Sequence, residues 1–215
     1  MRHLVITGGT GGLGGAISAA FAGPDWEIAA LGSRDLDVTD PAAVARFFDQ
    51  RPVDLLVCAA GISGESILAR LTEAVWDSVL AVNFGGASAC ARAALPGLIA
   101  RGGGHIVFIS SHAAIHPPTG LAAYATAKAA LLGLTRDLAA RHGAQGIRVN
   151  AILPGFLDTP MTRGVPPQRR DAVLAQHALG GFNSPESVGE FIRFLHDRLP
   201  HTSGQIFQLD SRIEP

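Results

Sequence analysis

The chain has 215 residues and a mass of 22.3 kDa, with 47% hydrophobic and 16% charged residues. Together with a mean hydropathy of +0.27, this excludes a disordered or low-complexity protein and predicts one well-covered core. The net charge of −1 and the lack of a basic run beyond Arg169–Arg170 argue against a nucleic-acid or anionic-membrane surface. Apolar stretches fall short of the roughly 20 residues that span a bilayer, and no signal-peptide core follows Met1, so we expect a soluble cytoplasmic protein.

Alternating apolar runs and helical patterns extend along the whole chain. In chain order we predict a strand at 3–7, a helix at 13–21, a strand at 27–31, a helix at 40–50, a strand at 53–59, a helix at 72–100, a strand at 105–110, a helix at 122–142, a strand at 147–152, a Pro/Gly-rich loop at 153–167, a helix at 184–197 and a strand at 205–209. Asp40-Pro41 and Ser184-Pro185 are typical helix starts. The pattern predicts a single α/β domain over residues 1–215: a Rossmann-type doubly wound parallel sheet of about seven strands with helices on both faces.

A glycine-rich loop separates the first strand from the first helix. Thr7-Gly-Gly-Thr-Gly-Gly-Leu-Gly14 satisfies both the GxGxxG pattern and the TGxxxGxG spacing. Glycines let the backbone approach a pyrophosphate, and the helix N-terminus offers free N–H groups. The alternative is an ordinary flexible glycine turn, but the order of strand, loop and helix favours a dinucleotide site.

Arg34 follows Gly14 by twenty residues and is itself followed by Asp35. An acid at the end of the second strand pairs with the ribose hydroxyls of NAD, whereas an arginine there suits the 2′-phosphate of NADP. Since the arginine comes first, we favour NADP(H) over NAD(H). A solvated Arg-Asp turn is the alternative without function.

The chain has a single tyrosine, Tyr124, and a single lysine, Lys128, among 17 basic residues. Four residues apart on a predicted helix, they share one face. A phenol is a poor proton donor or acceptor at pH 7, and a nearby ammonium favours its ionised form, so we expect Lys128 to lower the pKa of Tyr124. An ordinary surface pair is the alternative.

These motifs resemble the short-chain dehydrogenase/reductase family over nearly the whole chain. Tyr124-Ala-Thr-Ala-Lys128 matches its YxxxK signature, and Ser111, thirteen residues earlier, matches its serine, with Ser110 as the alternative. Further matches are Asn83, the glycine loop, Asp37-Val38, Arg148-Val-Asn150 and Ser203-Gly-Gln205. The stretch from Pro154 to Arg163 looks most like the 3-oxoacyl-(acyl-carrier-protein) reductase branch.

The resemblance implies roles for four catalytic residues. Tyr124 would protonate the carbonyl oxygen, Ser111 would hydrogen-bond it, and Lys128 would hold the nicotinamide ribose. Asn83 would anchor a water that links the lysine to solvent. The implied cofactor contacts are Gly8, Thr10, Gly11, Gly12, Leu13, Gly14, Arg34, Asp37, Val38, Ala60, Gly61, Tyr124, Lys128, Pro154, Gly155, Leu157 and Thr159. Residues 156–183 would form a substrate lid.

Two departures from the family pattern are visible. Cys58-Ala-Ala-Gly61 stands where the family usually has Asn-Asn-Ala-Gly, so side chains that brace the sheet are missing. Between Leu31 and Asp37 there is room only for a tight turn, so the helix that usually joins strands 2 and 3 is missing. We expect this to open one wall of the adenine pocket.

Other reactive residues point to no separate site. His112 and His116 are four apart but lack a nearby cysteine or acid, so we expect no metal site and place them at the rim of the substrate pocket. His177 lies in the lid. Cys58 and Cys90 lie in apolar surroundings and are expected to be reduced thiols.

The sequence therefore predicts an NADP(H)-dependent reductase acting on a small or acyl-carrier-borne ketone, working as a homodimer or homotetramer. Two alternatives stay open. One is an NAD-linked alcohol dehydrogenase, and the other is a non-catalytic protein that senses NADP(H) on the same fold.

Overall fold

The computed structural model describes residues 1–213, and six strands there form one parallel sheet in the order β2-β1-β3-β4-β5-β6. The strands are β1 (Arg2–Thr7), β2 (Trp26–Leu31), β3 (Leu55–Cys58), β4 (Gly104–Ile109), β5 (Ile147–Leu153) and β6 (Ile206–Gln208). The strand order reverses between β1 and β3, which places a topological switch point at their carboxyl ends. The predicted α/β parallel sheet is confirmed, with six strands where about seven were expected.

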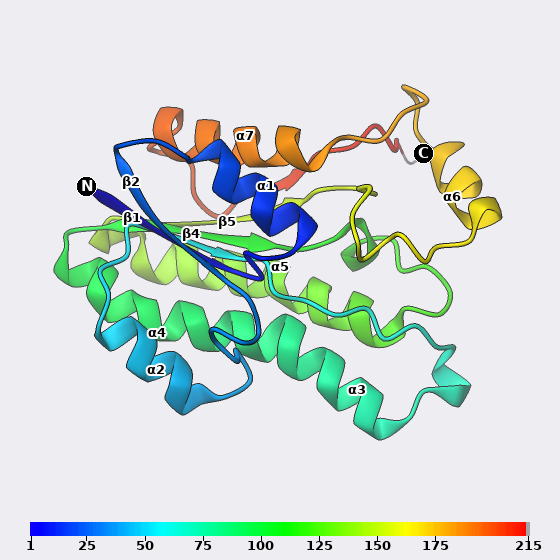
Figure 1. Cartoon of the computed structure of the whole chain (residues 1–215), viewed down its shortest axis with the longest axis horizontal. Coiled ribbons are helices and arrows are strands. Elements are labelled where there is room, and N and C mark those ends of the chain that lie inside the picture. The colour runs from blue at the N-terminus through cyan, green and yellow to red at the C-terminus, as the bar shows by residue number, and fades with distance from the viewer. Residues whose placement is uncertain (214–215) are drawn as a thin grey trace.

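Helices cover both faces of this sheet (Figure 1). One face carries α1 (Gly12–Ala20) and α7 (Pro185–Arg198), and the other carries α2 (Pro41–Asp49), α3 (Glu73–Leu80), α4 (Ala87–Ala100) and α5 (Ala122–His142). Successive strand residues point to opposite faces: Leu4 and Ile6 pack in the core layer beneath α1 and α7, whereas Val5 packs in the layer of α2 and α4. Both layers are filled by fully buried aliphatic side chains, so the sheet is the rigid frame of the molecule.

The predicted helix starts form as expected. The Asp40 carboxylate accepts hydrogen bonds from the N–H groups of Ala42 (2.9 Å) and Ala43 (3.1 Å) ahead of α2. The Ser184 hydroxyl accepts one from the N–H of Ser187 (3.1 Å) ahead of α7. Each cap satisfies backbone donors that the first helical turn leaves without partners.

The predicted helix at 72–100 contains an interruption. Between α3 and α4 lies a π-helical stretch, η2 (Ala81–Gly86). The buried side-chain amide of Asn83 donates to the carbonyl of Val79 (2.9 Å), which in a regular α-helix accepts from the backbone N–H of residue 83. Such bulges are frequent at functional sites.

The run Glu73–Ala100 is also the helical segment that is long and apolar enough, by composition, to cross a membrane, with a mean hydropathy of 1.2. The most apolar 18-residue stretch of this run is 44% buried inside the protein. Its helix α4 packs there against α2, β3 and β4. Its apolar character is that of a helix covering a sheet.

No helix forms between Leu31 and Asp37, as the short spacing predicted. The chain makes a turn in which the N–H groups of Asp35 and Leu36 bond to the carbonyl of Gly32. Leu36 and Val38 then pack into the core layer of α2 and α4. A further parallel strand would need a crossover of a dozen or more residues, so this segment adds none, which accounts for the six strands. The helix that connects β2 to β3 is α2, which begins only after this turn.

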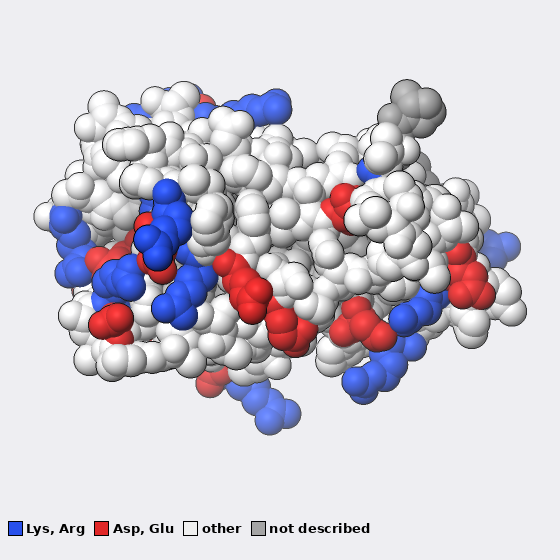
Figure 2. Space-filling view, turned by 90° about the horizontal axis from the view of Figure 1, so that it is seen from above, with Lys and Arg blue, Asp and Glu red and all other residues white. Residues whose placement is uncertain are grey.

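The described part of the chain also has three short 3₁₀ turns, η1 (Leu68–Arg70), η3 (His112–Ala114) and η4 (Gly143–Gln145). The sequence missed α6 (Pro167–Leu174), which forms inside the predicted lid. On the face covered by α1 and α7, basic and acidic side chains lie next to one another instead of gathering by sign (Figure 2).

Candidate active site

A cleft of about 920 Å³ opens at the carboxyl ends of the strands, beside the switch point between β1 and β3. Its walls come from the loops after β1, β2, β3, β4 and β5, from α5 and from the segment around α6. Most predicted cofactor contacts line it: Gly8, Thr10, Gly11, Gly12, Leu13, Gly14, Asp37, Val38, Ala60, Gly61, Tyr124, Lys128, Pro154, Gly155, Leu157 and Thr159. Residues far apart in sequence are thus gathered at one edge of the sheet.

The glycine loop forms one end of the cleft and leaves no room for side chains. A Cβ on Gly14 would lie 2.2 Å from the carbonyl oxygen of Gly8, and one on Gly8 would lie 2.7 Å from the carbonyl oxygen of Ala59. Gly8 also has a φ of +70°, which favours glycine. No side chain caps the start of α1 at Gly11, so its N–H groups face the cleft and suit the pyrophosphate of a dinucleotide.

The two acids after β2, Asp35 and Asp37, each accept hydrogen bonds within their own turn through one carboxylate oxygen. Gly32 and Ser33 line the cleft there. The Asp35 carboxylate accepts from the N–H of Gly32 (2.8 Å). Asp37 accepts from the N–H and hydroxyl of Thr39, which lowers the pKa of its carboxyl. Arg34 is exposed and lies outside the set of residues that line the cleft.

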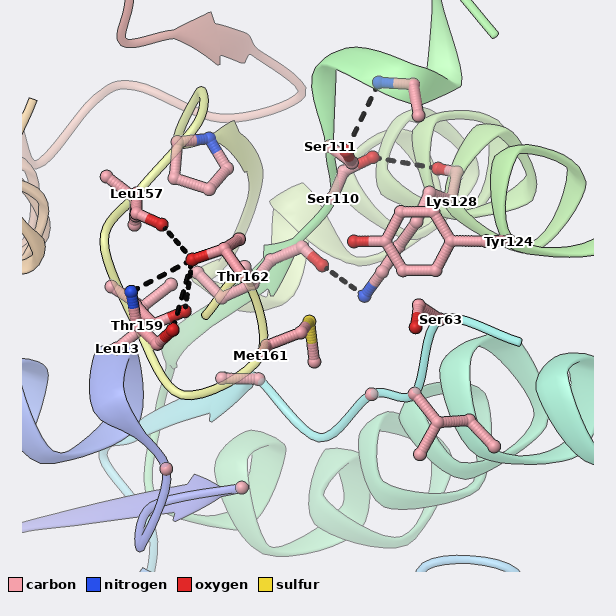
Figure 3. A pocket seen from close by; sticks show the side chains of 18 of the residues that line it. Leu13, Ser63, Ser110, Ser111, Tyr124, Lys128, Leu157, Thr159, Met161 and Thr162 are labelled. Carbon is pink, nitrogen blue, oxygen red and sulfur yellow. Dashed lines mark hydrogen bonds between the residues drawn. The ribbon is translucent and has the colours of Figure 1, made fainter. Parts of the chain in front are cut away.

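Tyr124, Lys128 and Ser111 meet at the middle of the cleft (Figure 3). Lys128 is 4% exposed, and its Nζ donates to the carbonyl of Ile109 (2.9 Å) and lies 5.6 Å from the centre of the Tyr124 ring. The Ser110 hydroxyl donates to the backbone carbonyl of Lys128 (2.8 Å), which ties β4 to α5. Ser110 therefore holds the frame, while the neighbouring Ser111 hydroxyl interacts with Tyr124.

The protonation of this group differs from the prediction. Burial raises the pKa of Tyr124 above its usual value, and the hydrogen bond from Ser111 offsets this only in part. Burial lowers the pKa of Lys128 to about 8. The expected lowering of the tyrosine pKa by Lys128 is wrong for this arrangement, because the ammonium lies over the ring face and bonds to Ile109 rather than to the phenolic oxygen.

Asn83 lies behind the cleft wall and does not line it. Its side-chain amide donates to the carbonyls of Ile62 (2.8 Å) and Val79, while its Oδ1 is buried and has no hydrogen-bond partner among residues 1–213. A Cβ on Gly61 would lie 2.6 Å from this Oδ1 and 3.5 Å from Nζ of Lys128. Gly61 thus lies between the buried Oδ1 of Asn83 and the buried ammonium of Lys128. Because Gly61 has no side chain, both groups can lie close to its backbone.

The loop after β5 closes the other side of the cleft. The Thr162 hydroxyl donates to the carbonyl of Leu157 (2.6 Å) and accepts from the N–H of Thr159 (3.0 Å), so the segment 157–162 is folded on itself. Farther out, Arg169 of α6 pairs with Glu65 of the opposite wall at 3.3 Å. This ion pair spans two walls of the cleft.

Sequence reasoning did not single out Ser33, Ile62, Ser63 and Arg212 of the cleft wall, whereas Met161 and Gln176, which also line it, lie within the segment predicted as a lid. Position could have found most of the former, because Ser33, Ile62 and Ser63 follow the carboxyl ends of β2 and β3. The predicted place of His112 and His116 at the pocket is confirmed. Within residues 1–213, no three His, Cys, Asp or Glu side chains lie together as a metal site. Burial raises the pKa of Cys58 well above its usual value, which suits an inert thiol.

Comparisons with known proteins agree with this geometry. A family model described as enoyl-(acyl carrier protein) reductase matches residues 17–211. The chain is 36% identical to the 3-oxoacyl-[acyl-carrier-protein] reductase of Thermotoga maritima over 75% of this chain and 66% of that protein. It is 34% identical to the (3R)-3-hydroxyacyl-CoA dehydrogenase of Rattus norvegicus over 89% of this chain and 87% of that protein.

Two solved structures have the same fold. The 3-oxoacyl-[acyl-carrier protein] reductase of Brucella melitensis superposes with a TM-score of 0.91 at 27% identity, over 99% of this chain and 91% of that one. A candidate NAD(P)-dependent gluconate 5-dehydrogenase from Beutenbergia cavernae, solved with NADP at low occupancy, superposes with a TM-score of 0.89 at 28% identity, over 98% and 95%. The chain belongs to the short-chain dehydrogenase/reductase family, a family of oxidoreductases that act on alcohol and carbonyl groups.

Proposed function

We propose that the protein reduces a ketone to a secondary alcohol with NADP(H), with Tyr124 as the proton donor. The observation that carries this proposal is that Tyr124, Lys128 and Ser111 meet in the same cleft as the side-chain-free glycine loop. A dinucleotide lying along this cleft would have its phosphates at the start of α1 and its nicotinamide beside the tyrosine.

The residues present fit a nicotinamide cofactor. The glycine loop and the start of α1 would hold the pyrophosphate, Asp37 and Val38 the adenine, and Pro154, Gly155, Leu157 and Thr159 the nicotinamide. When bound, the cofactor supplies the hydride that reaches the carbonyl carbon. Lys128 would bind the ribose and Gly61 would allow its close approach.

The chain's own residues then handle the proton. Because burial raises the pKa of Tyr124, its phenol is protonated at neutral pH and is ready to donate to an oxygen that gains negative charge. Ser111 holds that oxygen in place by a hydrogen bond. Lys128, with a pKa of about 8, and the unpartnered Oδ1 of Asn83 would bind the water that returns a proton to the tyrosine.

Three observations support NADP(H) over NAD(H). Asp35 and Asp37 already accept hydrogen bonds within their own turns. Arg34 stands exposed in the turn after β2, next to Ser33, which lines the cleft, and an arginine there suits a 2′-phosphate. A solved structure of similar fold contains NADP.

The relatives suggest the substrate class and setting. Proteins named 3-oxoacyl-[acyl-carrier-protein] reductase are among the relatives, so we propose a small or acyl-carrier-borne ketone as substrate. We also propose a cytoplasmic homodimer or homotetramer whose single domain, residues 1–215, carries a lid at 156–183. The lid would exclude water during the reaction.

The test is a spectrophotometric screen of NADPH oxidation against a panel of ketones that includes β-ketoacyl thioesters. We expect turnover with at least one ketone class, and no oxidation with any ketone would contradict the proposal.

The second candidate is an NAD-linked dehydrogenase that runs the oxidation, which the hydroxyacyl-CoA dehydrogenase relatives favour. Binding titrations of NADPH and NADH to the protein separate the two, because the reductase proposal requires tighter binding of NADPH. The same screen run backwards, with secondary alcohols and NAD⁺, gives an independent check.

A further inference from the structure

The last described segment, residues 209–213, crosses back over the lid, and we call it the C-terminal strap. The N–H of Ala178 donates to the carbonyl of Ser211 (2.9 Å), and the N–H of Leu179 donates to the Ser211 hydroxyl (3.2 Å). His177 and Arg212 form an isolated antiparallel bridge beside these bonds. The strap is therefore a fixed part of the wall, held by backbone contacts.

Arg212 of this strap lines the cleft and is braced from behind. Its Nε and Nη2 donate to Oδ2 of Asp210, at 2.8 Å and 2.5 Å, and the side chains of the two residues are 10% and 1% exposed. Gln208 donates to the other carboxylate oxygen of Asp210 (2.7 Å). Asp210 itself lies outside the set of residues that line the cleft. The carboxylate thus orients the guanidinium from the buried side.

Asp210 is in turn placed by the loop that follows β5. Gly155 has a φ of +82°, and a Cβ there would lie 2.8 Å from Cβ of Asp210. The glycine lets the strap pack directly on the loop that would hold the nicotinamide. Arg212 is therefore part of the same wall as the reaction centre, not of a remote surface.

Three Lys and Arg side chains line the cleft, and Arg212 is the one that a buried carboxylate holds in place. Lys128 donates to the Ile109 carbonyl, and Arg169 pairs with Glu65 across the outer part of the cleft. Nη1 of Arg212 makes no hydrogen bond with any residue among 1–213. A guanidinium held by one edge, with another edge free, matches the two oxygens of a carboxylate.

We infer that Arg212, positioned by Asp210, binds the carboxylate of an oxo-acid substrate and so makes the cleft selective for ketones that carry a carboxylate. This inference rests on the proposed ketone reduction and narrows its substrate class. Asp210 is a positioning residue, whereas Arg212 contacts the substrate.

The test measures binding by calorimetry to the full chain in the presence of NADP⁺. The probes are 3-oxobutanoate, 4-oxopentanoate and 5-oxohexanoate, each compared with its methyl ester, which keeps the ketone but removes the charge. We expect at least one acid to bind tenfold or more tightly than its ester. In Arg212→Gln this ratio should fall to near one, and Arg212→Lys should keep part of it, since the lysine keeps the charge without the planar fork.

Two controls separate recognition from folding. Arg198→Gln changes an exposed arginine at the end of α7 and should leave the ratio unchanged. The double variant Asp210→Asn/Arg212→Gln removes both buried charges, so it does not leave the Asp210 carboxylate unpaired. In this variant too, the acid should bind no more tightly than its ester. Equal binding of acid and ester by the unaltered protein, or an equal loss for both in Arg212→Gln, would overturn the inference. Failure of the proposed function would appear separately, as a lack of NADPH oxidation with every ketone, acid or ester.

Discussion

The two ends of the same parallel sheet treat buried polar groups in opposite ways. At the amino end, His105 is fully buried, its Nδ1 lies 3.4 Å from Nδ1 of His196, and the side-chain amide of Asn150 lies 3.0 Å from its other ring nitrogen. The two imidazole rings stack at 5.6 Å, and Arg148 donates to carbonyls at the end of α7. These polar groups at the amino end contact one another or nearby backbone carbonyls.

At the carboxyl end, polar groups are held in place but keep capacity for a ligand. The loop glycines expose backbone N–H groups, Asn83 keeps a buried acceptor without a partner, and Arg212 keeps one free nitrogen among the described residues. Both ends contain several buried polar groups, so their presence alone does not mark a site. What distinguishes the site is that its polar groups with spare capacity line or adjoin a cleft, whereas Nε1 of Trp26, buried at the amino end without a hydrogen-bond partner among residues 1–213, does not.

The largest expected effect is on the carboxyl end. Tyr124→Phe removes the proposed proton donor and should cut turnover by roughly a hundredfold or more, the usual contribution of general acid catalysis. NADPH binding, measured by fluorescence, should persist because the ring still fills its place. Full activity of this variant would refute the assignment of Tyr124.

A smaller effect is expected at the rim near β2. Arg34→Ala should weaken NADPH binding by about 1.5–3 kcal/mol, the contribution of a hydrogen bond to a charged group, and leave NADH binding nearly unchanged. Titration with each cofactor measures the difference. An equal loss for both would contradict the proposed preference for NADP(H).

The next prediction concerns the close packing between Asn83 and Lys128. Gly61→Ala would place a methyl group 2.6 Å from Oδ1 of Asn83, and overpacking of this kind destabilises by about 1–3 kcal/mol. Urea unfolding should show the loss, together with reduced turnover. Gly133→Ala is the matched control, because its Cβ would meet nothing within 4 Å and alanine should stabilise α5 by about 0.5–1 kcal/mol. If Gly61→Ala leaves the free energy of unfolding unchanged, the packing between Asn83 and Lys128 is looser than described.

The last prediction concerns the amino end. Burial lowers the pKa of His196 to about 4 and that of His105 well below its usual 6.5, so both are neutral in the folded protein. Since the unfolded chain binds these protons more readily, stability should be complete above pH 6.5 and fall as the pH drops toward 4. Protonation of His196 alone should lower the free energy of unfolding by on the order of 2 kcal/mol as the pH falls from 7 to 5.

Urea midpoints across this range test the prediction. His196→Gln should make the pH dependence less steep without abolishing it, because His105 remains. His201→Gln, at an exposed position, is the control variant. A pH dependence that stays equally steep in His196→Gln would rule out the amino-end pair as its source.

Local patterns were enough to predict the frame and much of the site. Strand and helix periodicity located the sheet, the caps at Asp40 and Ser184 started helices where expected, and the four-residue spacing of Tyr124 and Lys128 placed both in the cleft. Each of these depends on neighbours within one element or on the shared edge of a parallel sheet.

Features that depend on distant contacts were not predictable. The π-helical stretch at Asn83 involves the carbonyl of Ile62, and the cleft position of Arg212 depends on its bridge to His177 and on Gly155. The pKa of Tyr124 depends on how deeply the helix is covered, which residue spacing does not reveal. No periodicity identified α6, since none of its residues is buried.

The self-bonded turn at 157–162 has a consequence for how molecules enter. The segment between this turn and the pairing of Ala178 with Ser211 contains α6 and is fixed by hydrogen bonds at both of its ends. The Arg169–Glu65 ion pair joins this segment to the opposite wall, so an entering molecule must pass beside this ion pair or break it.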